Sequence, residues 1–148
     1  MSVEPNERER AFIDAARVAH LATTDAAGEP HVIPVCYAYD GERFFIAIDE
    51  KPKKPGRTLK RVRNVVETGR AALVIDRYDD VDWSRLAWLM VRGRAEMLGP
   101  EDADHPRIVA ALRDRYAQYR AMALERAPII AITPERITSW GAFDEDQE

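Results

Sequence analysis

The stretch HLATTDAAGEPHVIPVCYAYDGERFFIAID, residues 20–49, decides the fold. Turn signals interrupt its apolar runs at Asp25-Ala26-Ala27-Gly28 and again at Asp40-Gly41, and the second of these is typical of a short β-hairpin. The stretch therefore predicts three consecutive antiparallel strands, at about Ala19–Thr24, His31–Tyr39 and Arg43–Asp49.

Two features refine these strands. Pro34 has no backbone N–H to donate, so it predicts a sheet edge or a bulge in the second strand. Phe44 and Phe45 are adjacent and must face opposite sides of the third strand, so one belongs to the core and the other lies elsewhere.

The rest of the chain alternates helices and strands. Asn6 is a candidate cap for a helix that runs to about Val18. Helices are also expected at about Arg57–Glu67, ended by Thr68-Gly69, and at Glu101–Glu125, with a break near Tyr116–Tyr119. Further strands are expected at about Ala71–Tyr78, Leu86–Leu98 (with Gly93 at a bulge or a close contact), Ile129–Thr133 and Arg136–Trp140. The pattern predicts a mainly β protein, a six- to seven-stranded antiparallel barrel with peripheral helices.

Length and composition narrow the class of protein. The 148 residues suit a single domain, residues 1–148, with a frayed acidic tail at residues 142–148. The net charge of −4 argues against nucleic-acid binding. There is no apolar segment of signal-peptide or membrane-span type, which predicts a cytoplasmic protein with no membrane partner. The single cysteine and the three scattered histidines make no metal-site pattern.

A basic segment follows the third strand and is the first candidate binding site. Its seven cations are Lys51, Lys53, Lys54, Arg57, Lys60, Arg61 and Arg63. At the start of a helix they suit a phosphate, because helix N–H groups and charge-assisted hydrogen bonds then act together. A solvated helix face is the alternative interpretation, and composition alone favours it.

Aromatic residues form the second candidate set. Trp83, Trp88, Trp140, Tyr37, Tyr78, Phe44 and Phe45 could line a slot for a flat ring, or serve as packing in the core and at a subunit interface. His20 is interpreted as structural rather than as a base, Cys36 as an inert thiol, and the acidic run from Asp76 to Asp82 as a solvated loop. No residue pair suggests nucleophilic catalysis, and no catalytic residue is assigned.

In order and spacing, several motifs resemble the pyridoxamine phosphate oxidase-like split barrel, and more narrowly its deazaflavin (coenzyme F420)-dependent oxidoreductases. They are D-E-K-P-K (49–53), L-K-R-V-R-N (59–64), Y-D-D with a following Trp (78–83), V-R-G-R-A-E (91–96) and T-S-W-G (138–141). The resemblance covers about residues 10–141. It implies an FMN-binding split-barrel fold and a homodimer with two cofactor sites at the subunit interface.

The resemblance also implies site residues. Lys60 and Arg61 occupy the place of a cation pair that grips the cofactor phosphate. Lys53, Lys54 and Arg57, in an insertion before them, are expected to share that role. Val35, Cys36, Tyr37, Ala47 and Ile48 are expected along the ring system, mainly through backbone groups. Trp88 stands where flavin enzymes often carry a polar residue, and Trp140 is similar to a tryptophan that reaches the ring from the second subunit.

The implied function is hydride transfer between coenzyme F420 and a small organic substrate. FMN as the cofactor, with oxidase or reductase activity, is the alternative within the class. A carrier or sensor without turnover is the alternative outside it. A heme role would require an exposed axial histidine, and none of the three is well placed for it. The Arg-x-His that recognises the vitamin in the true oxidase is missing, because GAFDEDQE ends this chain.

Overall fold

The computed structural model describes residues 3–49 and 58–143. Its strands are β1 (Ala19–Thr24), β2 (Pro30–Val35), β3 (Ala38–Tyr39), β4 (Phe44–Ala47), β5 (Arg70–Arg77), β6 (Ala87–Leu98) and β7 (Ile129–Gly141). Its helices are α1 (Glu7–Ala15), α2 (Lys60–Thr68), α3 (His105–Arg115) and α4 (Ala117–Arg120), with a short 3₁₀ turn at Trp83–Arg85.

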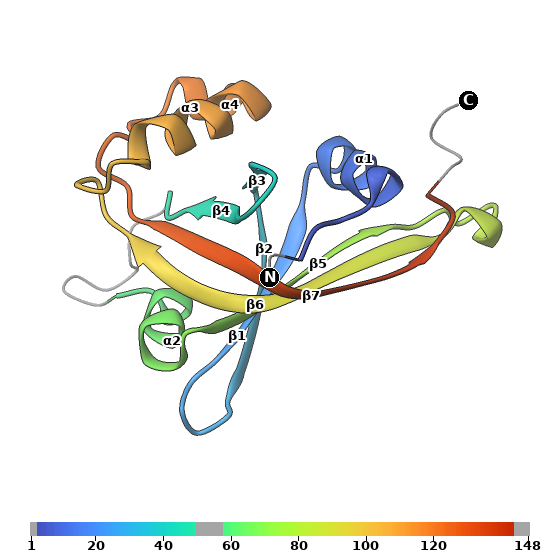
Figure 1. Ribbon diagram of the computed structural model, residues 1–148, viewed down its shortest axis with the longest axis horizontal. Coiled ribbons are helices and arrows are strands. Elements are labelled where there is room, and N and C mark those ends of the chain that lie inside the picture. The colour runs from blue at the N-terminus through green and yellow to red at the C-terminus, as the bar shows by residue number, and fades with distance from the viewer. Residues whose placement is uncertain (1–2, 50–57, 144–148) are drawn as a thin grey trace.

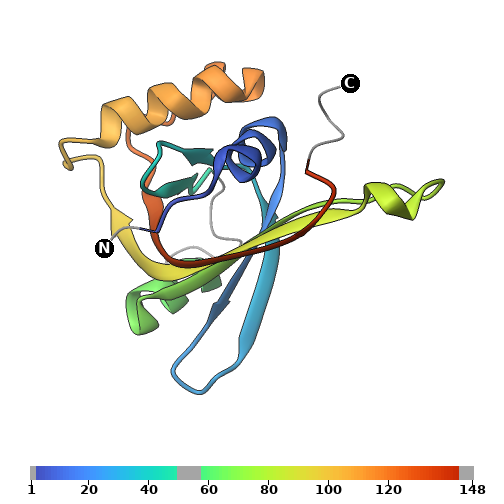
Figure 2. The same cartoon turned by 45° about the vertical axis from the view of Figure 1, so that its right-hand side comes forward.

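All seven of these strands belong to one antiparallel sheet, in the order β2-β1-β5-β6-β7-β4-β3. The sheet curls strongly, and β6 and β7 form a long curved ribbon along its middle (Figures 1 and 2). The curl turns its two ends, β2 and the β3–β4 hairpin, toward each other although no ladder joins them. The predicted split barrel with peripheral helices is confirmed.

The second predicted strand is two strands rather than one. β2 ends at Val35, and β3 begins at Ala38 on the opposite end of the sheet. The chain therefore crosses the open side of the barrel through Cys36 and Tyr37. Pro34 lies in β2, which is an edge strand, as its missing donor predicts.

The last two predicted strands are one strand, β7. The ladder between β6 and β7 shifts register beside Gly93, where Arg92 pairs with Arg136 and Gly93 with Pro134. Glu135 is the extra residue of this bulge, which lets the strand continue past a proline. A Cβ added at Gly93 would lie 2.1 Å from the carbonyl oxygen of Thr133, so only glycine permits this approach.

The first helix ends at Ala15, three residues before the predicted Val18. Its cap is as expected, because the Asn6 side chain accepts from the Glu9 N–H. Its last carbonyls are satisfied from outside the helix: the Tyr37 hydroxyl donates to the Ile13 carbonyl at 2.6 Å. Arg115 donates to the carbonyls of Asp14 and Ala16. These side chains donate the hydrogen bonds that the N–H groups of a further helical turn would otherwise donate.

The second and third predicted helices begin later in the structure than in the prediction. α2 begins at Lys60, and Gly69 ends it in the left-handed conformation, with φ of 68°. α3 begins at His105, because residues 99–104 form turns. The expected break in the third helix is confirmed at Tyr116, whose extended backbone separates α3 from α4.

Two apolar clusters hold the fold together. Phe44 belongs to the cluster inside the curled sheet, together with Leu21 and Leu89. Phe45 belongs to the cluster between the outer side of the sheet and α3, together with Leu112. The two adjacent phenylalanines therefore face opposite sides as predicted, but both are core residues.

Ala142 and Phe143, the first two residues of the predicted tail, are in contact with the rest of the fold. The Ala142 N–H donates to the Leu86 carbonyl, and the Phe143 ring packs edge-on against Phe12 with ring centres 4.9 Å apart. Residues 144–148 lie outside the described residues. Among the helices of the described ranges, none is long and apolar enough to cross a membrane.

We expect Gly93→Ala to lower the free energy of unfolding by about 3 kcal/mol, because the backbone of β7 has to move away from the new methyl group. Gly28→Ala is the matched control: Gly28 has φ of 83° but nothing within 4 Å of its added Cβ, so only the conformational cost of about 1 kcal/mol applies. Urea unfolding of both variants measures the difference. Equal losses would contradict the close-approach interpretation.

Candidate functional site

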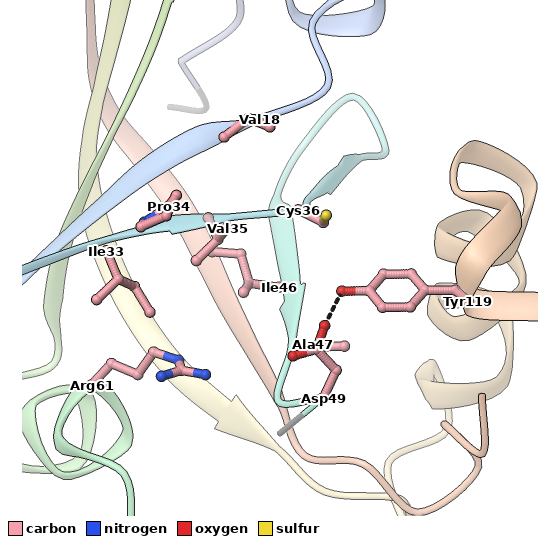
Figure 3. Close-up of a pocket in the computed structure, with 10 residues that line it drawn as sticks. All are labelled: Val18, Ile33, Pro34, Val35, Cys36, Ile46, Ala47, Asp49, Arg61 and Tyr119. Atoms are coloured by element: carbon pink, nitrogen blue, oxygen red, sulfur yellow. Dashed lines mark hydrogen bonds between the residues drawn. The ribbon is translucent and has the colours of Figure 1, made fainter. Parts of the chain in front are cut away.

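A pocket of about 220 Å³ lies in the split of the barrel, between the β2 edge and β4 (Figure 3). Its lining side chains are Val18, Ile33, Pro34, Val35, Cys36, Ile46, Ala47, Asp49, Arg61 and Tyr119. We call it the split pocket. Its walls are mostly apolar, with Arg61 at one end and with Asp49 and Tyr119 at the other, which suits a ligand that has an apolar body and an anionic group.

Helix α2 orients Arg61 into the split pocket by docking on the β1–β2 hairpin. The Asn64 amide donates to the Thr23 hydroxyl at 3.0 Å, and both side chains are buried. The Glu67 carboxylate accepts the N–H of Ala26 at 2.7 Å. With one face of the helix held in this way, Arg61 lies inward and is only 6% exposed.

The Lys60 side chain has a different role from its neighbour. Its ammonium group lies 2.9 Å from the Asp25 carboxylate in the hairpin turn, and it does not line the split pocket. This hydrogen bond is the main reason that the pKa of Asp25 lies below its usual value. The predicted phosphate-binding pair is thus divided: Arg61 faces the pocket, and Lys60 fastens α2 to the hairpin.

The start of α2 adds to the positive character of the pocket. Leu59 stands at the cap position and provides no side-chain hydrogen bond, so the first N–H groups of the helix have no side-chain cap. The pKa of His31 on β2 lies below its ordinary value of 6.5. Burial is the main cause, and the nearby cations Arg61 and Lys60 lower it further. These charges and the dipole of α2 favour a phosphate at this end of the pocket.

A hydrogen-bonded group closes the other end. The Tyr119 hydroxyl of α4 donates to the Asp49 carboxylate at 2.5 Å, and the Cys36 thiol lies beside it (Figure 3). Burial, and then this hydrogen bond, raise the pKa of Tyr119 far above its usual value. Burial raises the pKa of Cys36 as well, which fits the expected inert thiol. The tyrosine therefore stays protonated and holds the end of β4 against α4.

Four of the predicted site residues line the split pocket: Val35, Cys36, Ala47 and Arg61. Tyr37 does not, because its side chain is fully buried, its N–H donates to the Tyr116 hydroxyl and its carbonyl accepts from Arg115. The Ile48 N–H is likewise taken by the Pro128 carbonyl. The N–H groups of both residues, and the carbonyl of Tyr37, are therefore bonded within the chain.

The two predicted tryptophans lie far from the split pocket of their own chain. Trp88 and Trp140 pair with each other across β6 and β7. Ala47 pairs with Ile129 at the start of β7, so Trp140 lies eleven residues further along, up to ~36 Å at ~3.3 Å per residue. Within one chain they do not complete the pocket. Lys53, Lys54 and Arg57 lie outside the described residues.

Sequence reasoning missed the closing pair, Asp49 and Tyr119. The sequence places Asp49 at the end of a strand and at the start of the D-E-K-P-K motif, and it places Tyr119 at a helix break. The two residues are 70 positions apart, so no local pattern joins them. None of the three histidines is among the side chains that line the pocket, and His105 is buried with its Nε2 atom 2.7 Å from the Ala127 carbonyl.

The His31 environment predicts a pH-dependent stability. Its pKa is depressed in the folded chain, so the unfolded chain binds the proton more readily and stabilisation present above pH 6.5 is lost as the pH falls. We expect His31→Asn to flatten the pH dependence of the free energy of unfolding below pH 6.5, measured by urea unfolding. An unchanged slope in the variant would contradict this placement of His31.

Comparison with known proteins agrees with this architecture. The model of the pyridoxamine 5'-phosphate oxidase family matches residues 5–141. A 5a,11a-dehydrotetracycline/5a,11a-dehydrooxytetracycline reductase of Streptomyces rimosus is 31% identical over 138 residues, which cover 91% of this chain and 82% of the reductase.

Solved structures show the same fold at lower identity. The conserved hypothetical protein Rv2991 of Mycobacterium tuberculosis has a TM-score of 0.73 at 21% identity, covering 95% of this chain and 86% of that one. A heme binding protein of Mycobacterium smegmatis has a TM-score of 0.71 at 21% identity, covering 96% of this chain and 57% of that one. A FAD-binding protein of Mesorhizobium loti has a TM-score of 0.64 at 20% identity, covering 88% and 89%. From its sequence match and its split barrel, the chain belongs to the pyridoxamine 5'-phosphate oxidase family.

Proposed function

We propose that this protein is an oxidoreductase that binds coenzyme F420 in the split pocket and transfers a hydride to or from a small organic substrate. The observation that carries the proposal is the buried Arg61 guanidinium, held beside the uncapped start of α2 at one end of an apolar slot. A guanidinium that lines a pocket binds a phosphate through charge-assisted hydrogen bonds, and a helix N-terminus beside it favours the same anion.

The pocket fits part of a flavin-type cofactor. Ile33, Val35, Ile46 and Ala47 make an apolar slot suited to a flat ring. Its volume of about 220 Å³ lies below the roughly 300–1,000 Å³ of sites that enclose a whole drug-sized ligand. The remainder of the cofactor would extend out of the split, toward solvent or a second chain.

Two features favour a deazaflavin over FMN. The motif order resembles the F420-dependent oxidoreductases, and the sequence places Lys51, Lys53 and Lys54 shortly before α2, where they suit the long acidic tail of F420. The 31%-identical relative bears the name of a reductase, which favours turnover over storage. FMN as the cofactor, and a carrier or sensor without turnover, remain the alternatives that the experiments below separate.

In this proposal the bound deazaflavin supplies the hydride. Arg61 and the first N–H groups of α2 bind phosphate, and the apolar wall keeps water from one face of the ring. Tyr119 and Asp49 hold β4 to α4 and so keep the slot at its width. The chain thus contributes binding, orientation and shielding.

We also propose that the protein is a homodimer that pairs through the outward face of the sheet. Register places several small and apolar side chains in rows on this face, and His20, Arg92 and Arg136 lie in the same rows. The small and apolar ones are Ala22, Val32, Ala72, Val74, Met90 and Thr138. Val32 is 61% exposed in the single chain, and Trp140, at the end of the same face, is 55% exposed. A second copy would cover this surface and bring Trp140 toward the partner's site.

The contribution of Arg61 to cofactor binding can be measured. We expect Arg61→Ala to weaken cofactor binding by about 2 kcal/mol, or roughly 30-fold in Kd, through loss of charge-assisted hydrogen bonds. Lys60→Ala is the matched control and should change the Kd less than threefold, because Lys60 is paired with Asp25. Titrations monitored by tryptophan fluorescence, with F420 and with FMN side by side, measure both variants. Tight binding of FMN alone selects the flavin alternative, and binding of neither cofactor overturns the proposal.

The proposed dimer contact can be tested by measuring the mass of the assembly. Light scattering at micromolar concentration should give about twice the 16.8 kDa chain mass for the wild type, and one chain mass for Val32→Glu. Val66→Glu is the control, because Val66 is also exposed (72%) but lies on α2, away from this face. A monomeric wild type, or a dimeric Val32→Glu, would rule out the proposed contact.

A further inference from the structure

Four exposed arginines gather at one end of the outward face of the sheet. Arg70 pairs across the strands with Arg94, and Arg92 pairs with Arg136. Like charges directly opposite each other on neighbouring strands destabilise a sheet. Glu135 forms an ion pair with Arg70, but within residues 3–49 and 58–143 no ion pair or side-chain hydrogen bond reaches the other three. We call these four residues the arginine cluster, and their charge is left for a group outside the chain to balance.

The opposite end of the same face is acidic and aromatic. Asp76 lies on this face six residues from Arg70 along β5, or about 20 Å. Beyond it, the end of the β5–β6 hairpin projects away from the rest of the fold (Figures 1 and 2). We call residues 78–85 the hairpin tip. Tyr78 and Trp83 in the tip are 62% and 67% exposed. The tip also carries three carboxylates: Asp79, Asp80 and Asp82.

The hairpin tip is held in one conformation by its own side chains. The Asp79 carboxylate accepts two backbone N–H groups of the tip and lies 3.1 Å from the Arg85 guanidinium. The Trp83 indole donates to the Tyr78 hydroxyl, which donates to Asp80. A group that is already ordered loses little conformational entropy when it docks. The tip is therefore well suited to a contact with another chain.

Symmetry leaves two orientations for a face-to-face contact between two copies. The strands of packed sheets are commonly aligned, and a two-fold axis in the contact plane then runs either along the strands or across them. An axis along the strands places one arginine cluster on the other. An axis across the strands places each arginine cluster on the acidic end of its partner. Because like charges across an interface are costly, the charges favour the axis across the strands.

The uncharged middle of the face shows where this axis passes. One cross-strand row consists of Val74, Met90 and Thr138. Arg92 and Arg136 lie two residues to one side of this row, and Trp88 and Trp140 lie two residues to the other side. An axis along the row therefore places the partner's Trp88 over Arg92. It likewise places the partner's Trp140 over Arg136. A guanidinium over an indole ring is a favourable cation–π arrangement.

The same axis accounts for a groove at the arginine end of the face. The groove has a volume of about 280 Å³, and small side chains such as Ala72 line it together with Arg70 and Arg92. By register, Ala72 faces the partner's Asp76 and Arg70 faces the partner's Tyr78. The carboxylate then lies beside Arg92 on the neighbouring strand, and the exposed phenol ring enters the groove.

We propose that two copies of this chain dock through their outward faces with each β5 antiparallel to its counterpart, so that the acidic end of one copy, from Asp76 to the hairpin tip, lies on the arginine cluster of the other. This inference rests on the proposed homodimer and specifies its orientation and the groups that recognise the partner. Each contact occurs twice, because the interface is two-fold symmetric. Carboxylates and aromatic rings of the partner then balance the guanidinium groups that lie unpaired in the single chain.

Charge reversal tests the contact, with the dimer Kd measured by sedimentation equilibrium. We expect Arg92→Glu and Asp76→Lys each to weaken dimerisation at least tenfold, because each places like charges together. The two changes in one chain should bring the Kd back to within threefold of the wild type, because the pair is exchanged. Arg126→Glu is the matched control: Arg126 is exposed, lies between α4 and β7, and should leave the Kd unchanged.

The exchanged chain separates the two orientations. With the axis along the strands, Glu at position 92 would meet Glu and Lys at position 76 would meet Lys, so the dimer would not recover. Failure to recover therefore overturns the orientation, and an unchanged Kd in either single variant overturns the contact. The wild type gives a test without substitution: its dimer should weaken at least tenfold between 0.05 and 0.5 M NaCl, and a constant Kd overturns the charge pairing.

The docking and the proposed function fail in different ways. If F420 binds and the exchanged chain stays monomeric, the proposed cofactor stands and the docking is wrong. If the exchange restores the dimer and neither F420 nor FMN binds, the docking stands and the proposed cofactor chemistry is wrong. A wild-type dimer that requires inorganic phosphate, and that Asp76→Lys leaves unchanged, assigns the arginine cluster to a free anion and overturns the docking.

Discussion

The bend of the β6–β7 ribbon at Gly93 is the constraint on which the rest of this structure depends. The backbone of β7 comes so close at Thr133 that no side chain fits between the two strands. The bulge beside it curves the ribbon, and the sheet curls with it (Figure 2). Because the curl turns β2 toward β4, a slot exists between them, and the split pocket is that slot.

The packing of α2 decides which of its cations face the slot. Asn64, Glu67 and Lys60 hold the helix to the β1–β2 hairpin. Arg61 is thereby placed on the inward face, beside helix N–H groups that have no side-chain cap. One residue of the basic segment, Arg61, is buried in the wall of the pocket, while its neighbour Lys60 forms a structural ion pair. Water screens the partly buried Lys60–Asp25 pair, whereas a cation buried as deeply as Arg61 interacts more strongly with an anion.

The differences between expectation and structure have a common origin in long-range contacts. The first helix is shorter than its periodicity predicts because Tyr37 and Arg115, distant in sequence, satisfy its last carbonyls. The predicted strand through Tyr39 divides because the chain must cross the open side of the barrel at Cys36. Phe45 is buried because α3 covers the outer side of β4, which strand periodicity does not reveal.

The sequence by itself determined the antiparallel strand order along the chain, the turns, the glycine at the bulge, the edge character of the proline-containing strand and a basic helix start. These depend on local backbone preferences and on neighbours a few residues apart. Only the tertiary structure decided that Arg61 and not Lys60 faces the slot, that Asp49 meets Tyr119, and that His20 and Asp76 share a cavity with Phe12. The Lys60–Asp25 and Tyr119–Asp49 pairs join residues 35 and 70 positions apart, and the cavity brings together two strands and a helix. These contacts form only after the sheet has curled.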